Sequence, residues 1–87
     1  MTGSYNLTIK RSAEKELKKI PTADLRRIID RIHGLAQQPR PAACEKLAGE
    51  TERDRVRQGD YRIVYGIDDA ARLVEIIKIG HRREVYR

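Results

Sequence analysis

Residues 55–65 read RVRQGDYRIVY, and this stretch decides the fold of the C-terminal half of the chain. Its centre, Gly59-Asp60, favours a two-residue turn of type II′, which prefers glycine at the first turn position. The run 61–67 is apolar on both faces, as expected of a central strand. We therefore predict a β-hairpin in which Arg57 lies directly opposite Arg62.

Arginine side chains gather on one face of this predicted hairpin. Side chains alternate along a strand, so in this register Arg55, Arg57 and Arg62 share one face, and Arg53, which has the parity of Arg55 and Arg57, extends the row. Like charges directly opposite each other destabilise a sheet by roughly a few tenths of a kcal/mol. An anion held between the arginines would offset that repulsion. Alternatively, the Arg57 and Arg62 side chains extend into water or pair with Asp54 and Glu52.

The remaining sequence predicts an α+β domain in the order β-α-α-β-β-β, with two N-terminal helices packed on one face of a small, mainly antiparallel sheet. Ser12 and Thr22 are expected to cap the helices, Pro21 to separate them, and Gly80 to end the last strand. Alternating and helical apolar spacings define the elements. Strands are expected at 5–10, 53–57, 61–67 and 73–79, and helices at 12–20 and 22–36.

The composition describes one small, basic domain spanning residues 1–87. Nineteen Lys and Arg against thirteen Asp and Glu give a net charge of +6, which favours a nucleic acid or an acidic protein as partner. Residues 1–20 lack the apolar core of a secretory signal, and no apolar run approaches the ~20 residues of a membrane helix. We therefore expect a cytoplasmic protein that makes no membrane contact.

The cysteine and histidine content argues against a metal site. Cys44 is the single cysteine, so it has no partner for an internal disulfide. Cys44, His33 and His81 do not fall at the spacing of metal ligands. No metal and no other cofactor is expected.

Two segments carry a resemblance to a known family. Residues 55–65, together with residues 76–86 (IIKIGHRREVY), resemble the RelE branch of the RelE/ParE toxins. Segments 12–17 and 41–49 are similar to the family's first helix and to its loop into the second strand, so the resemblance covers nearly the whole chain. It implies a RelE-like fold and the toxin half of a type II toxin–antitoxin pair, inhibited by a RelB-like antitoxin. The chain would then occur as a monomeric toxin or as a toxin–antitoxin hetero-oligomer.

The resemblance also implies a reaction and the residues that perform it. RelE toxins cleave mRNA in the ribosomal A site without a metal ion, through attack of a ribose 2′-hydroxyl on the adjacent phosphate. The catalytic residues implied here are Arg57, Arg62, His81, Arg82 and Tyr86. The residues expected to bind RNA phosphates are Arg53, Arg55 and Arg83.

One departure from the family affects the proton transfers. Where the family has a lysine as general base, this chain has arginine, whose pKa of above about 12 prevents easy deprotonation. Arg57 is therefore expected to stabilise charge, and His81 to carry protons, with Tyr86 as the alternative. On sequence alone, both residues also have structural interpretations: His81 as a surface residue at a strand end, and Tyr86 as a packing residue.

Two other functions are compatible with the sequence. A ParE-type toxin would share the fold and inhibit DNA gyrase without nuclease chemistry. A basic module that binds nucleic acid without reaction would show steep salt dependence and would not stop growth. The retained arginines, together with His81 and Tyr86, favour the nuclease over the gyrase inhibitor. The binding module is disfavoured because four tyrosines without Phe or Trp make a poor stacking platform for single strands.

Overall fold

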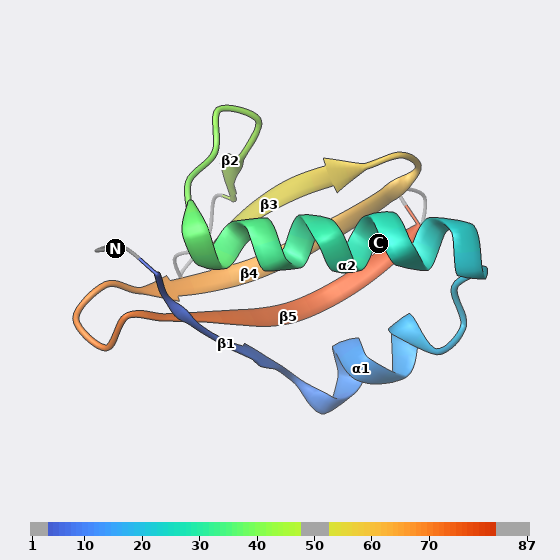
Figure 1. Cartoon of the computed structure of the whole chain (residues 1–87), viewed down its shortest axis with the longest axis horizontal. Helices are drawn as coiled ribbons and strands as arrows, with labels where there is room; N and C mark the ends of the chain where they lie inside the picture. Colours follow the sequence, from blue (N-terminus) through green and yellow to red (C-terminus); the bar gives the residue numbers. More distant parts are fainter. Residues whose placement is uncertain (1–3, 48–52, 82–87) are drawn as a thin grey trace.

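The computed structural model describes residues 4–47 and 53–81 of the chain. Within these residues the elements are β1 (Asn6–Ile9), α1 (Arg11–Leu17), α2 (Thr22–Gln37), β2 (Glu45–Leu47), β3 (Arg53–Gln58), β4 (Tyr61–Asp68) and β5 (Leu73–His81). The strands form one sheet in the order β1-β5-β4-β3-β2 (Figure 1). β1 runs parallel to β5, and the other neighbouring strands are antiparallel.

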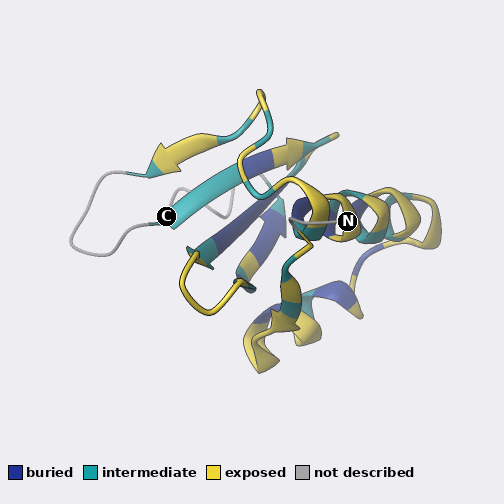
Figure 2. Cartoon of the chain, turned by 60° about the vertical axis from the view of Figure 1, so that its left-hand side comes forward, coloured by how far each residue is buried: buried dark blue, intermediate teal, exposed yellow. Residues whose placement is uncertain are grey.

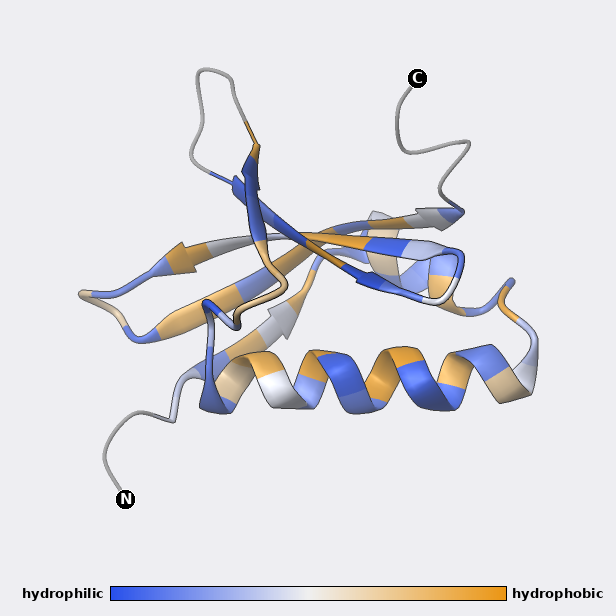
Figure 3. Ribbon diagram, turned by 90° about the horizontal axis from the view of Figure 1, so that it is seen from above, coloured by the Kyte–Doolittle hydropathy of each residue, from blue (hydrophilic) through white to orange (hydrophobic). Residues whose placement is uncertain are grey.

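The hydrophobic core lies between the two helices and one face of the sheet. α2 turns its apolar side towards the strands and its charged side to solvent (Figure 3). The buried core residues come from both layers: Ala13, Leu17, Ile20, Ile28, Ile32 and Leu35 on the helical side, and Val56, Ile63, Tyr65, Val74, Ile76 and Ile79 in the sheet (Figure 2). The predicted α+β fold with its helices on one face is confirmed. Neither helix of the described residues covers the opposite face of the sheet, which we call the open face.

The hairpin between β3 and β4 has the predicted register. Arg57 pairs with Arg62, one step from the turn. Gly59 has φ +62°, a left-handed conformation that glycine adopts without a side-chain clash. The pair adjacent to the arginines, Val56 and Ile63, is buried against the helices. The two arginines therefore lie on the open face.

A bulge in β5 changes which residues reach that open face. The register between β4 and β5 shifts between Val64 and Tyr65, so that Val64 pairs with Lys78 whereas Tyr65 pairs with Ile76. Ile77 is the extra residue. The shift lets Ile76 and Ile79 both enter the core although three positions separate them, and Lys78 lies exposed on the open face.

Both predicted helix caps are wrong. α1 begins at Arg11, with Lys10 rather than Ser12 in the N-cap position, because the sheet pairing continues as far as the Lys10 N–H. α2 begins at Thr22, with Pro21 as its N-cap residue. Neither N-cap residue makes a side-chain capping hydrogen bond.

The last strand extends further than predicted. β5 continues through Gly80 to His81, so the expectation that Gly80 ends the strand is wrong. Pairing persists because β4 offers partners at both positions, Arg62 for Gly80 and Tyr61 for His81. The edge strand β2 has no counterpart in the predicted element order. Its three residues are too few to produce an alternating pattern.

Candidate nucleic-acid interface

The arginines of β3 and β4 form two adjacent rows across the open face. In one row, Arg57 on β3 lies opposite Arg62 on β4, which pairs in turn with Gly80 on β5. In the next row, Arg55 lies opposite Val64, which pairs with Lys78. Same-face rows are about 6.6–6.8 Å apart along a strand. We call Arg53, Arg55, Arg57 and Arg62 the arginine face.

The two central arginines differ in their surroundings. Arg57 is exposed, whereas Arg62 is only 9% exposed. Gly80, which pairs with Arg62, adds no side chain above the sheet. The backbone of Arg57 is held from the helical layer, since Arg31 Nη2 donates to the Arg57 carbonyl oxygen at 3.3 Å. The pair therefore presents an exposed and a buried guanidinium next to a position without a side chain.

Arg55 has an acidic partner on the neighbouring edge strand. Its Nε and Nη2 lie 3.0 and 2.9 Å from Glu45 Oε1, and the two residues are direct cross-strand partners. The Glu45 side chain is 64% exposed, so this ion pair contributes little to stability and can exchange for another anion. The sequence-based alternative placed the acidic partners at positions 52 and 54. Asp54 pairs with Tyr65 on the helix-covered face, and Glu52 lies outside the described residues.

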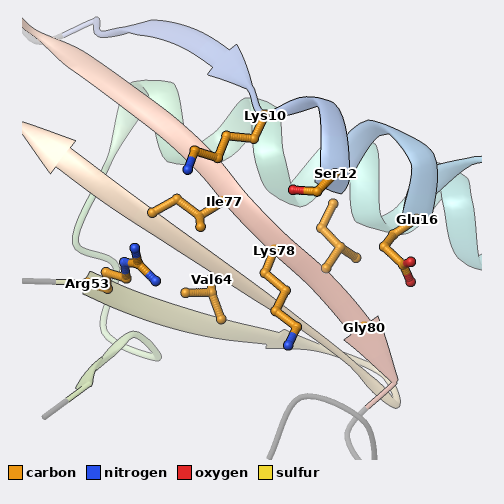
Figure 4. A pocket seen from close by; sticks show the side chains of 9 residues that line it. Lys10, Ser12, Glu16, Arg53, Val64, Ile77, Lys78 and Gly80 are labelled. Carbon is orange, nitrogen blue, oxygen red and sulfur yellow. The ribbon is translucent and has the colours of Figure 1, made fainter. Parts of the chain in front are cut away.

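A groove adjoins the arginine face where α1 approaches β5. Its volume is about 500 Å³, and Figure 4 shows its lining side chains converging from α1, β3, β4 and β5 and from Lys10, which lies between β1 and α1. Val64 and Ile77 form an apolar floor, and three cations surround it: Lys10, Arg53 and Lys78. The Nε atom of Arg53 is buried and has no hydrogen-bond acceptor among the described residues.

His81 lies on the other face of the sheet. Its ring packs edge-on against Tyr61, with centroids 5.7 Å apart and an interplanar angle of 77°. Both residues line a hollow of about 370 Å³ beside Glu16, Lys19 and Ile20 on the helix-covered side. The structure therefore brings Arg53, Arg55, Arg57 and Arg62 together and does not bring the His81 ring to them. The other predicted site residues, Arg82, Arg83 and Tyr86, lie outside the described residues.

The clearest perturbed acid lies at the far end of the sheet, near the β4–β5 turn. Arg40 donates to both Asp69 carboxylate oxygens (3.2 and 3.0 Å), and the Tyr5 hydroxyl donates to Oδ1 at 2.7 Å. The hydrogen bonds from Arg40 and Tyr5 lower the pKa of Asp69, and the bond from Arg40 has the larger effect. Because the bonds join Tyr5, directly before β1, to the loop after α2 and the β4–β5 turn, we interpret this cluster as structural. Within residues 4–47 and 53–81, no group of His, Cys, Asp or Glu side chains could hold a metal ion.

Lys10 and Lys78 line this groove but are not among the site residues predicted from the sequence. Lys78 lies in the predicted strand 73–79, and its positive charge is the one sequence feature that could have indicated a role in anion binding. Strict alternation from Val74 and Ile76 would place it in the core, and only the bulge at Ile77 turns it outwards. Lys10 reaches the groove through the turn of the chain from β1 into α1.

Comparisons with known proteins place this geometry in a family. The family model described as the ParE toxin of the type II toxin–antitoxin system parDE matches residues 7–86. The chain is 32% identical to toxin RelG of Mycobacterium tuberculosis, over 95% of this chain and 97% of the relative. It is 33% identical to toxin RelE of the same organism, over 95% and 87%.

Solved structures show the same fold. The archaeal RelE–RelB complex from Pyrococcus horikoshii matches with a TM-score of 0.82 at 28% identity, over 93% of this chain and 98% of the matched chain. The isolated E. coli RelE toxin matches with a TM-score of 0.79 at 28% identity, over 95% and 92%.

Two helices on one face of a five-stranded mixed sheet, with a basic opposite face, define a small toxin of the type II toxin–antitoxin class. The chain belongs to the RelE/ParE family. None of the helices in the described part of the chain has the length and apolar character to cross a bilayer.

Proposed function

We propose that this toxin is a ribosome-dependent endoribonuclease that cleaves mRNA in the A site and thereby inhibits translation and growth. The observation that carries the proposal is the opposition of Arg57 and Arg62 on the open face, next to Gly80. Two guanidinium groups in this arrangement match the bidentate binding of a phosphate. Its substrate is in the cytoplasm, and so is the toxin.

The reaction needs no cofactor. The ribose 2′-oxygen attacks the adjacent phosphorus, the bond from phosphorus to the 5′-oxygen breaks, and a 2′,3′-cyclic phosphate forms. The proton of the 2′-hydroxyl goes to a base, and the leaving 5′-oxygen takes up a proton from an acid. Arg57 and Arg62 stabilise the negative charge that develops on the equatorial oxygens. Arg53, Arg55 and Arg83 bind neighbouring phosphates.

The remaining catalytic residues are assigned by resemblance. Arg82 adds charge stabilisation, and Tyr86 stacks on or orients the RNA. The proton carrier is His81 or Tyr86. The position of the His81 ring against Tyr61, on the helix-covered face, favours Tyr86 over His81 for direct transfer to a phosphate on the arginine face. If His81→Gln and Tyr86→Phe both cleave at the wild-type rate, neither residue transfers the protons.

A RelB-like antitoxin is the expected inhibitor. The solved relatives from Pyrococcus horikoshii and Mycobacterium tuberculosis are toxin–antitoxin complexes, RelE–RelB and RelBE2. The charge of +6 favours an acidic or amphipathic segment that folds on binding. The chain then exists either as a monomeric toxin or within a toxin–antitoxin hetero-oligomer.

The decisive experiment is brief induction of the toxin in a bacterial host, followed by mapping of new mRNA 5′ ends. We expect cuts confined to translated regions and in phase with codons. Arg57→Ala and Arg62→Ala should both abolish them, whereas Arg26→Ala, an exposed arginine on α2, should not. Arg57 is exposed, so its variant retains the fold even if loss of the buried Arg62 does not.

The second candidate function is inhibition of DNA gyrase, because the matching family model is described as a ParE toxin. Gyrase inhibition would produce DNA breaks and growth arrest with intact mRNA. Growth without arrest, cuts or breaks would leave a basic nucleic-acid-binding module.

A further inference from the structure

The groove beside the arginine face combines two chemical characters that a nucleotide requires. Val64 and Ile77 provide an apolar floor, and Lys10, Arg53 and Lys78 provide positive charge around it (Figure 4). Apolar and aromatic surfaces accept the face of an unstacked base or a ribose, and cations bind the phosphodiester. A volume of about 500 Å³ lies within the usual range of small-molecule pockets.

The three cations of the groove are available to a ligand. Among the described residues, none of Lys10, Arg53 and Lys78 forms a salt bridge. Glu16 also lines the groove, and its carboxylate pairs with Lys19 at 3.5 Å. The buried Arg53 Nε has a proton without an acceptor, which normally costs free energy unless a ligand or water supplies one.

The groove lies directly beside the pair formed by Arg57 and Arg62. Lys78 occupies the row next to the one formed by Arg57, Arg62 and Gly80. Rows on one face of a sheet are about 6.6–6.8 Å apart, a step comparable with that between successive phosphates of an extended RNA strand. Gly80 lines the groove and has no side chain to separate it from Arg62.

We propose that this groove binds a nucleotide next to the scissile phosphate, with its phosphodiester on Lys10, Arg53 and Lys78 and its base or ribose on Val64 and Ile77. The proposal rests on the proposed function and adds Lys10 and Lys78 to it as positioning residues. Continuity with the arginine pair favours single-stranded RNA over an acidic peptide as the occupant.

The test measures RNA binding without cleavage. The full-length toxin is titrated with a short, fluorescent, 2′-O-methyl RNA, whose blocked 2′-oxygen prevents the reaction, over a range of salt concentrations. The variant is Lys10→Gln combined with Lys78→Gln. The control is Lys15→Gln combined with Lys18→Gln, which removes the same charge from exposed positions of α1 and its C-cap.

The expected result is a several-fold weaker affinity for the groove variant, with a salt slope smaller by about 0.7 for each RNA phosphate that the variant leaves without a cation. The control should retain the wild-type slope. In a purified translation system the groove variant should raise KM several-fold while kcat changes little, because the lysines position the substrate without contacting the reacting atoms.

The outcomes separate this inference from the proposed function. If wild-type protein cleaves mRNA and the groove variant matches it in affinity, slope and KM, the groove inference is wrong and the proposed function stands. If RNA binding depends on the lysines but no mRNA is cut, the groove is supported and the nuclease assignment fails. If the variant instead loses affinity for the antitoxin while binding RNA normally, the groove is a peptide site and the proposal is overturned.

Discussion

Replacement of Arg57 by glutamine should stabilise the fold. Arg57 and Arg62 are direct cross-strand partners, so their positive charges repel each other in the absence of an anion. At a charge separation of about 6 Å, Coulomb's law in water gives roughly 0.7 kcal/mol. Screening at 0.1 M salt, where the Debye length is ~10 Å, reduces this to about 0.4 kcal/mol. For a domain of this size the melting temperature should rise by about 2–3 °C.

The assay is thermal unfolding followed by circular dichroism, at 0.1 and 1 M salt. The matched control is Arg27→Gln, which removes the same charge from an exposed position of α2. At 1 M salt the Debye length falls to ~3 Å, and the advantage of Arg57→Gln over the control should largely disappear. Equal melting temperatures for the two variants at 0.1 M, or a gain at Arg57 that persists at 1 M, would refute the like-charge argument.

Three further predictions concern the scaffold. Tyr65→Phe removes the bond from the buried hydroxyl to the Pro39 carbonyl (2.7 Å) and should lower the free energy of unfolding by about 1 kcal/mol in denaturant titrations. Gly59→Ala forces a side chain into a left-handed conformation and should cost about 1–2 kcal/mol in the same assay, whereas a smaller loss would mean that the turn rearranges. Because the bonds from Arg40 and Tyr5 lower the pKa of Asp69 in the folded state, its stabilising effect is complete above about pH 5 and is lost as the pH falls through the folded-state pKa. The stability difference between wild type and Asp69→Asn should therefore shrink on acidification, and a difference that stays constant would contradict the assignment.

The hairpin could be predicted because the residues that determine its register are neighbours in the sequence. The Gly59-Asp60 turn sets the register, and the register alone places Arg57 opposite Arg62 and both on one face. The course of β5 could not be predicted in the same way. Its bulge at Ile77 depends on tertiary packing, because Ile76 and Ile79 both enter the core only if one extra residue is accommodated between them.

The sequence also could not predict which residues distant along the chain lie close together in the fold. Lys10 and Lys78 meet in the groove because β1 pairs with β5 and the chain then turns into α1 along the same strand. The family resemblance predicts His81 beside the arginines, whereas its pairing with Tyr61 puts it on the helix-covered face. β5 continues two residues beyond its predicted end, and the alternation of side chains along this extension decides on which face His81 lies.

Because side chains alternate along the hairpin, residues that stabilise the core and residues of the open face follow one another in a single stretch of chain. Val56 and Ile63 are buried against the helices, while their neighbours Arg57 and Arg62 lie on the open face. A substitution of the exposed Arg57 changes the charge of the open face without creating a cavity in the core, whereas a truncation at Val56 or Ile63 would lose both burial and packing. One fold can therefore present different surfaces to an RNA phosphate or to a protein target. For this reason, variants of the open face, rather than of the core, discriminate between the nuclease and the gyrase inhibitor.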